Sequence, residues 1–285
     1  MKIKNWLVLC VSLVVVVLAA VGLHTYNTYS AQSAPDQITV GSQGSDYDVW
    51  QHIAASPQAK KLNLKITVKQ ISDGVQLNNA TSENNVNVNA FQSYSYMHAY
   101  NKENPQHKLA VIGTTYLEPL GIYSDKYDSL KQIPTGATIA LANNPANTAR
   151  GLLLLQDAGL IKLKKDFGLL GNTNDVVENP RGLKFKEIDD TTGPRVLNSV
   201  DAALISNTVA LEGKLNVLHD SLYHEKINQS TRQNINILAT AAGNQQKKAY
   251  QKLLKLYHEP AIQKYVKKQY HGTKIEVKKP VSYLK

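Results

Sequence analysis

Cysteine is almost absent from this chain: among its 285 residues there is a single one, Cys10. It lies in an apolar run near the N-terminus, so no thiol occurs anywhere beyond that run. Disulfides, thiolate zinc sites and a cysteine nucleophile are therefore excluded for the rest of the chain. The eight histidines are scattered, and no pair has helical ligand spacing with a carboxylate nearby. We therefore expect no metal site.

The sequence also lacks the short motifs that mark common catalytic sites. It contains no HExxH, no nucleophile elbow and no P-loop, which are the patterns of zinc proteases, of serine hydrolases and of nucleotide-binding enzymes. Internal repeats and low-complexity segments are absent as well. We expect a protein that is not an enzyme and that needs no cofactor.

Excess charge is confined to one end of the chain. The formal net charge is +10, yet residues 244–285 carry 11 lysines against two glutamates, and residues 35–243 are close to neutral. A nucleic-acid-binding protein spreads basic residues over its binding face, so we expect no nucleic-acid partner. The basic tail is predicted to form a solvated face or one that lies near an anionic membrane surface.

Residues 1–35 form an export signal or a membrane anchor. Lys2 and Lys4 precede residues 6–23, which are 18 residues without a charge, at the border between a signal core and a membrane span. Basic residues before the run place the N-terminus in the cytoplasm and the rest outside. Cys10 comes too early in the run for lipid attachment. The protein is therefore predicted at the outer face of the cell membrane, or secreted.

Beyond residue 35 the sequence alternates between strand and helix patterns, which predicts an α/β fold with largely parallel sheets. Pro119, Gly121 and Pro134 mark the predicted crossing between two lobes. Strands are predicted at 37–41, 64–71, 86–90, 109–117, 137–142, 183–189, 202–205 and 235–239. Helices are predicted at 46–60, around Thr148, at 245–257 and onward to Tyr270.

Three segments, taken in order and spacing, carry a recognisable signature. They are Val-Asn-Val-Asn-Ala-Phe-Gln-Ser-Tyr-Ser-Tyr at 86–96, the long stretch 133–160 with Ala-Asn-Asn-Pro-Ala-Asn-Thr-Ala-Arg-Gly at its centre, and 175–185 followed by Pro194-Arg195. Together they resemble the methionine-binding lipoprotein (MetQ/NlpA) family of bacterial ABC importers. The resemblance covers nearly all of residues 37–270.

The resemblance implies an extracytoplasmic solute-binding protein with a two-lobed, periplasmic-binding-protein-like α/β fold and a ligand cleft between the lobes. Lobe 1 would comprise residues 36–118 plus 237–285, and lobe 2 residues 119–236. The implied ligand is methionine, a related amino acid or a short peptide, and the implied partner is an ABC permease in the membrane. We expect a monomer. Two alternatives stay open: a cell-surface interaction protein that has lost transport, and an extracellular enzyme of the same fold.

Arg150 is the principal candidate for holding an amino-acid ligand. A zwitterion that enters a dry cleft needs both of its charges compensated, and a guanidinium binds a carboxylate with a planar two-pronged fork. Arg150 lies in the first turns of a leucine-rich helix, where the helix dipole adds to the attraction. A surface arginine on an amphipathic helix is the alternative.

The resemblance assigns further residues to the cleft. It implies that Asn236 holds the ligand's head group, that Phe91 and Tyr96 cover its side chain, and that Tyr116 is an aromatic residue near the crossing. Asn147, three residues before Arg150, either lines the cleft or caps the helix.

Several positions depart from the family pattern. The chain has Gly74 and Val209 where the family usually has tyrosine, Ser93 where it has histidine, and Ser206 where it has asparagine. These wall residues are smaller, so we expect a pocket that is larger or wetter than one for methionine. Ser93 and Ser206 are accordingly predicted to set selectivity, and larger amino acids or short peptides become plausible ligands.

Overall fold

The computed structural model describes residues 17–18, 34–226 and 229–285. Most of the predicted signal or anchor segment, including Cys10, lies outside these residues. The chain divides at residue 36, and residues 37–285 form one compact unit that holds the sheets and the cavity discussed below. No helix of the described part is both long and apolar enough to cross a membrane.

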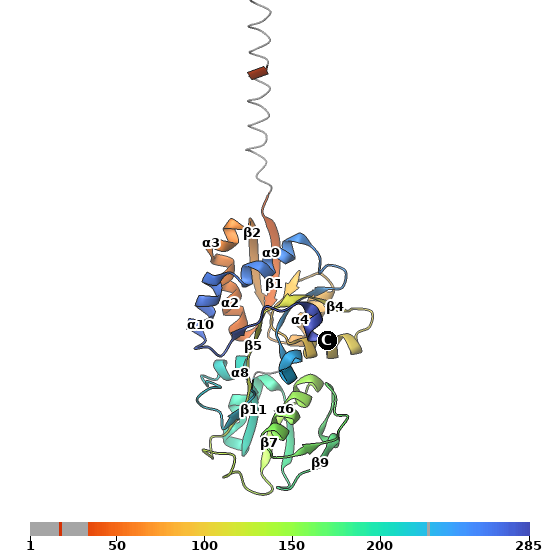
Figure 1. Ribbon diagram of the computed structural model, residues 1–285, viewed down its shortest axis with the longest axis vertical. Coiled ribbons are helices and arrows are strands. Elements are labelled where there is room, and N and C mark those ends of the chain that lie inside the picture. The colour runs from red at the N-terminus through yellow and green to blue at the C-terminus, as the bar shows by residue number, and fades with distance from the viewer. Residues whose placement is uncertain (1–16, 19–33, 227–228) are drawn as a thin grey trace, which may run out of the picture. The chain divides into compact units, whose positions relative to one another are not determined.

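Two five-stranded sheets organise this unit, one in each lobe (Figure 1). The sheet of lobe 1 has the order β2-β1-β3-β13-β4. Its strands are β1 (Asp36–Ser42), β2 (Leu64–Gln70), β3 (Val88–Asn89), β4 (Leu109–Thr114) and β13 (Ile237–Ala241). The helices that accompany it are α2 (Gly44–Ala55), α3 (Pro57–Lys61), α4 (Gly74–Ser82), α5 (Tyr94–Glu103), α9 (Lys248–Tyr257) and α10 (Pro260–Gln269).

The sheet of lobe 2 has the order β10-β7-β11-β6-β12. Its strands are β6 (Leu120–Tyr123), β7 (Thr138–Ala142), β10 (Lys184–Ile188), β11 (Ala202–Ser206) and β12 (Tyr223–His224). Helices α6 (Pro145–Asp157), α7 (Gly193–Val196) and α8 (Asn207–Glu212) belong to this lobe. Two small ladders complete the structure, β8 (Lys162–Leu163) with β9 (Val176–Glu178) and β5 (Tyr116–Leu117) with β14 (Ile275–Glu276).

The α/β class is as predicted, but both sheets are mixed rather than largely parallel. Strand β1 runs parallel to β3, whereas β13 runs antiparallel to β3 and β4. In lobe 2, β7 is parallel to β10 and β11, but β6 is antiparallel to β11 and β12. Strands β6 and β13 are the ones that the chain enters directly after it passes from one lobe to the other. The chain enters β6 and β13 from the end of the sheet that faces the other lobe, so these two strands run antiparallel to their neighbours.

The chain passes between the sheets twice, once between β4 and β6 and once between β12 and β13. The predicted lobe boundaries at residues 119 and 236 fall in these two intervals. Pro134, by contrast, lies between β6 and β7, within lobe 2, so its assignment to a crossing was wrong.

The helix predicted over 46–60 is two helices that meet at Ser56. The Ser56 hydroxyl accepts a hydrogen bond from the N–H of Ala59, and Pro57 occupies the first turn of α3. A residue before proline avoids the helical region, and serine is a good N-cap while proline suits the first helical position. Local chemistry therefore ends α2 and starts α3 within one residue.

The packing of α6 in the core of lobe 2 can be tested directly, because this helix has leucines on both its buried and its exposed face. Leu152 is 0% exposed and packs in the lobe 2 core, whereas its neighbour Leu153 is 38% exposed. We expect Leu152→Ala to lower the free energy of unfolding by about 2–5 kcal/mol, because it removes buried methyl groups and leaves a cavity. The matched Leu153→Ala variant should lose less than about 1 kcal/mol. Denaturant unfolding measures both, and equal losses would contradict this packing.

Candidate ligand-binding site

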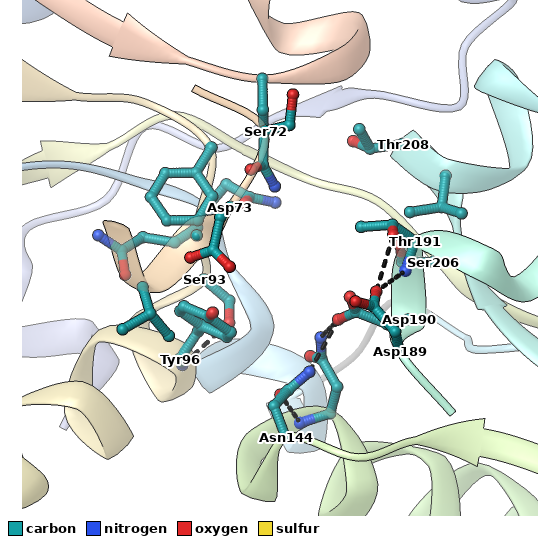
Figure 2. Close-up of a pocket in the computed structure, with 18 of the residues that line it drawn as sticks. Ser72, Asp73, Ser93, Tyr96, Asn144, Asp189, Asp190, Thr191, Ser206 and Thr208 are labelled. Carbon is teal, nitrogen blue, oxygen red and sulfur yellow. Dashed lines mark hydrogen bonds between the residues drawn. The ribbon is translucent and has the colours of Figure 1, made fainter. Parts of the chain in front are cut away.

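A cavity of about 520 Å³ lies between the two lobes (Figure 2). Lobe 1 contributes the start of α4, the turn after β3 and the start of α5, and lobe 2 contributes the segments that follow β7, β10 and β11. These are the carboxyl ends of strands, where open α/β sheets generally bind ligands. The cavity volume suits a small organic molecule.

Seven of the eight residues predicted from the sequence line this cavity. They are Phe91, Ser93, Tyr96, Asn147, Arg150, Ser206 and Asn236. Tyr116 is the exception. It is 5% exposed on β5, and its hydroxyl donates to the carboxylate of Asp46 at 2.6 Å, inside lobe 1. The hydroxyl thus satisfies a buried acid instead of facing the cleft.

The apolar part of the wall is built from two rings of lobe 1. Phe91 and Tyr96 meet edge to face, with ring centroids 5.8 Å apart. A Cβ atom at Gly74 would lie 2.8 Å from the hydroxyl of Tyr96 and 2.9 Å from the ring of Phe91. Because Gly74 has no side chain, the rings of Phe91 and Tyr96 pack directly against its backbone. These two rings occupy the space that a side chain at position 74 would take. Burial raises the pKa of Tyr96, and the carboxylates of Asp190 and Asp73 raise it further.

Four further polar residues line the cavity: Ser93, Ser206, Asn147 and Asn236. Ser93 is the N-cap of α5, where its hydroxyl accepts from the N–H of Tyr96, and it forms an isolated β-bridge with Asn236. Ser206 ends β11 and directly precedes α8. Asn147 does not cap α6, because Asn144 does so by accepting from the N–H of Asn147. The side-chain amide of Asn147 is thereby left to donate to Asp190 Oδ2 at 2.8 Å.

Arg150 is buried, with 8% of its surface exposed, and it already holds a carboxylate. Its Nε donates to Glu225 Oε1 at 2.9 Å and its Nη2 to Glu225 Oε2 at 2.5 Å, while Nη2 also donates to the carbonyl of Glu118 at 2.8 Å. Burial alone would lower the pKa of Arg150, but the paired carboxylate of Glu225 outweighs it and the pKa is raised. The two guanidinium nitrogens that were predicted to bind a ligand carboxylate thus bind the carboxylate of Glu225 instead. Nη1 is the guanidinium nitrogen for which the described residues supply no hydrogen-bond acceptor.

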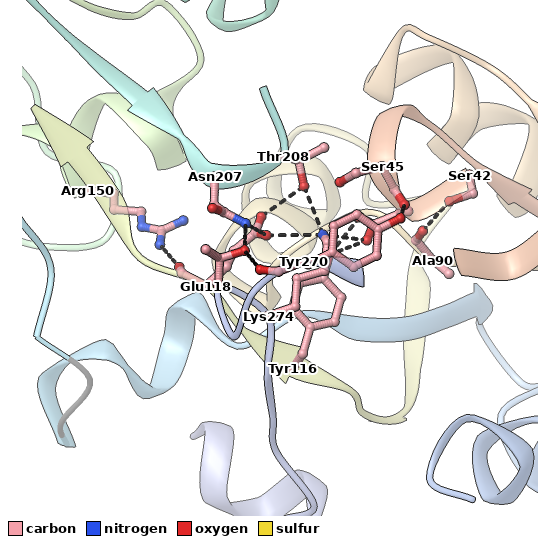
Figure 3. Close-up of polar contacts among 12 residues, drawn as sticks. Ser42, Ser45, Ala90, Tyr116, Glu118, Arg150, Asn207, Thr208, Tyr270 and Lys274 are labelled. Atoms are coloured by element: carbon pink, nitrogen blue, oxygen red, sulfur yellow. Dashed lines mark hydrogen bonds and ion pairs between the residues drawn. The ribbon is translucent and has the colours of Figure 1, made fainter. Parts of the chain in front are cut away.

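A second buried cation, Lys274, joins the two lobes near the cavity (Figure 3). Its Nζ donates to Asp46 Oδ1 at 2.9 Å and to Glu118 Oε2 at 3.1 Å. Glu118 lies in the first crossing and lines the cavity, and its carboxylate also accepts from Asn207 and Thr208 of α8. Lobe 1, lobe 2 and the crossing therefore meet at one carboxylate.

The pKa values of this cluster reflect one cation shared by two acids. Burial alone would raise the pKa of Glu118, but Lys274 and the Asn207 amide outweigh it, so that pKa is lowered. Burial raises the pKa of Asp46, and Lys274 only partly compensates. The pKa of Lys274 is raised because Asp46 and Glu118 outweigh its burial.

Four charged residues at or beside the site were not predicted from the sequence: Glu225, Lys274, Asp46 and Asp190. Glu225 is 75 residues from Arg150, and Lys274 is 228 residues from Asp46. Ion pairs between residues so far apart in the sequence leave no local spacing pattern from which they could be predicted. Among the described residues, no group of three or more potential ligands is placed to hold a metal ion.

Two α/β lobes joined by two crossings, with a cavity at the strand ends between them, define a periplasmic-binding-protein fold. Within that class, this chain belongs to the NlpA lipoprotein family, whose family model matches residues 38–278.

Individual relatives agree with this assignment. The methionine-binding lipoprotein MetQ of Bacillus subtilis is 35% identical over 228 residues, which are 78% of this chain and 82% of that protein. A solved nutrient-binding protein from Burkholderia cenocepacia, bound to methionine, is 36% identical with a TM-score of 0.79, and the match covers 84% of this chain and 99% of that one. A periplasmic substrate-binding protein of an ABC transporter from Coxiella burnetii is 30% identical with a TM-score of 0.79 and coverages of 84% and 100%.

Proposed function

We propose that this chain is the extracytoplasmic substrate-binding protein of an ABC importer and that it captures methionine, a related amino acid or a short peptide. The observation that carries the proposal is the cavity between the lobes. It gathers seven residues that were selected from the sequence for ligand binding, in a chain of the NlpA lipoprotein family. The names of the Bacillus and Burkholderia relatives support methionine or a similar molecule as the ligand.

The proposed mechanism is non-covalent capture without a chemical reaction. An open state with separated lobes binds the ligand, and the ligand shifts the population toward a closed state that docks on the permease. We assign the ligand carboxylate to Arg150 Nη1, since Nε and Nη2 are engaged by Glu225. Asn236 would hold the head group, and Phe91 with Tyr96 would cover the apolar side chain.

We further propose that the protein acts as a monomer at the outer face of the cell membrane. The family and the Bacillus relative are named lipoproteins, which supports an extracytoplasmic site of action. The partner would be the membrane permease of the same importer, which the Coxiella relative's name as an ABC transporter component supports.

Thermal unfolding of the full-length protein with the twenty amino acids, D-methionine and a dipeptide panel tests this function. A ligand at 100 times its Kd should stabilise the folded state by about 2.7 kcal/mol, which raises the melting temperature by several degrees. Hexanoate and glucose serve as non-matching solutes. The proposal fails if no amino acid or peptide shifts the transition and if mass spectrometry finds no such molecule released from the denatured protein.

A further inference from the structure

The cavity carries more negative charge than the protein itself compensates. Among the residues that the structure describes, four carboxylates line the cavity, those of Asp73, Glu118, Asp189 and Asp190, against the single cation Arg150. Arg150 is paired with Glu225 and Glu118 with Lys274. Three carboxylates are left without a cation from these pairs.

Two of the three are exposed and have local structural roles. Asp73 caps α4 by accepting from the N–H of Gln76 at 2.7 Å. Asp189 caps the short turn after β10 by accepting from the N–H and the hydroxyl of Thr191. Helix N-termini compensate such charges, and water solvates the remainder. Neither residue therefore requires a ligand.

Asp190 differs from both, because it is partly buried and its contacts are neutral. Its Oδ2 accepts from the side-chain amides of Asn144 and Asn147, each at 2.8 Å. Burial raises the pKa of Asp190, the amides of Asn147 and Asn144 offset this only in part, and the neighbouring carboxylate of Asp189 raises the pKa further. Two neutral donors orient this carboxylate without neutralising it.

The position of Asp190 places it beside the proposed carboxylate site. Asn147 and Arg150 lie three residues apart on α6, so their side chains are neighbours on one helix face, with Cβ atoms about 5–6 Å apart. Both line the cavity, and Asn147 holds Asp190. Figure 2 shows Asp190 and Asn144 on the wall opposite Tyr96 and Asp73. A ligand bound against this wall can therefore contact the guanidinium of Arg150 and the carboxylate of Asp190 at the same time.

We propose that Asp190 is a specificity-determining residue that pairs with a primary ammonium group of the ligand, and that Asn144 and Asn147 are positioning residues for its carboxylate. The inference rests on the proposed function and names the chemistry that the site selects. The ammonium group comes either from the α-amino group of an amino acid or peptide, or from a lysine-like side chain. A charge-assisted pair in a closed cleft contributes more than a neutral hydrogen bond, so ligands without an amine bind more weakly.

Three pairs of ligands distinguish the two sources, because the members of each pair differ only by the α-amino group. The pairs are L-methionine and 4-(methylthio)butanoate, L-lysine and 6-aminohexanoate, and methionyl-methionine and 4-(methylthio)butanoyl-methionine. Calorimetric titration compares the full-length wild type with Asp190→Asn, which keeps the acceptor for Asn144 and Asn147 but removes the charge. Asp157→Asn, at the exposed C-terminal end of the same helix α6, removes an equal charge away from the cavity.

If the α-amino group is the partner, Asp190→Asn should weaken binding of the member that has the α-amino group by roughly tenfold or more in each bound pair, and should leave binding of the member that lacks it unchanged. If a lysine side chain is the partner, L-lysine and 6-aminohexanoate should weaken together. Asp157→Asn should bind as the wild type does. Equal binding by wild type and Asp190→Asn overturns this inference alone. A wild type that binds none of the six ligands and none of the amino acids and dipeptides of the thermal-unfolding panel overturns the proposed function with it.

Discussion

Replacing Arg150 with alanine should lower the free energy of unfolding by about 3–5 kcal/mol and should also abolish tight ligand binding. The stability loss follows from the contacts of the guanidinium. Its removal leaves the Glu225 carboxylate buried with neutral donors but without its cation, and removes the donor to the Glu118 carbonyl. An uncompensated buried charge is costly. Glu118 and Glu225 lie in the two crossings, so the loss falls where the lobes are joined.

The binding loss has a separate cause, since Arg150 is the only cation among the described residues of the cavity wall, and the ligand carboxylate would lose it. We expect a cost of about 2–5 kcal/mol in binding, which is on the order of 30-fold to several thousand-fold in Kd. The double variant Arg150→Met/Glu225→Met separates the two effects, because removing both charges should restore most of the stability and none of the binding. Denaturant unfolding and calorimetry measure the two quantities. An Arg150→Ala protein that is as stable as the wild type, or that binds as tightly, would show that the guanidinium has neither role.

A second large effect is expected when Lys274 is replaced by methionine. The side chain of Lys274 is 1% exposed, and its ammonium is paired with Asp46 and Glu118. Methionine fills similar space without charge, so two neighbouring carboxylates remain buried without a cation. We expect a loss of about 3–5 kcal/mol near neutral pH. Lys278→Met, an exposed position four residues further on, should change stability by less than about 0.5 kcal/mol.

The loss should depend on pH with a definite sign. In the wild type, the lowered pKa of Glu118 contributes stability that is present above its unfolded value of 4.5 and is lost as the pH falls. The raised pKa of Asp46 acts oppositely, because the folded state holds its proton more tightly and the cost of its charge disappears on acidification. Without Lys274 both carboxyls behave like Asp46.

The difference between wild type and Lys274→Met should therefore shrink steadily from neutral pH toward about pH 4. Urea unfolding at a series of pH values measures it. A difference that stays constant or grows on acidification would mean that the ammonium does not compensate these carboxylates.

The parts of the site that could be predicted from the sequence are those that lie next to strand ends. Phe91 follows β3, Ser206 ends β11, and Arg150 lies on the helix after β7. Strand ends gather at one edge of a sheet, which is why these residues meet at one cavity. Arg150 was selected for the chemistry of its guanidinium, whereas Phe91 and Ser206 were selected by comparison with the family pattern. The α/β class followed from the alternation of strand and helix patterns. The direction of each strand did not follow from it, because a strand that the chain enters from the other lobe runs the opposite way.

The parts that could not be predicted are buried charge pairs between distant segments. Arg150 was expected to offer its fork to a ligand, but Glu225 occupies two of its nitrogens from 75 residues away. Tyr116 was expected in the cleft, yet Asp46 holds its hydroxyl from 70 residues away. Helices α4 and α5 were missed for a local reason, because their apolar residues are much less concentrated on one face than those of α9 and α10. Asp73 and Ser93 start them through capping hydrogen bonds.

The position of β13 fixes the order in which the lobes can be completed during synthesis. The lobe 2 sheet is drawn from one continuous stretch, from β6 to β12, so all of its strands exist before β13 is made. The lobe 1 sheet needs β13 inserted between β3 and β4. Until then, these two strands have open edges that can pair with another chain. A chain that has emerged only as far as β12 therefore contains every strand of the lobe 2 sheet but lacks one from the lobe 1 sheet, and its open edges favour aggregation until β13 arrives.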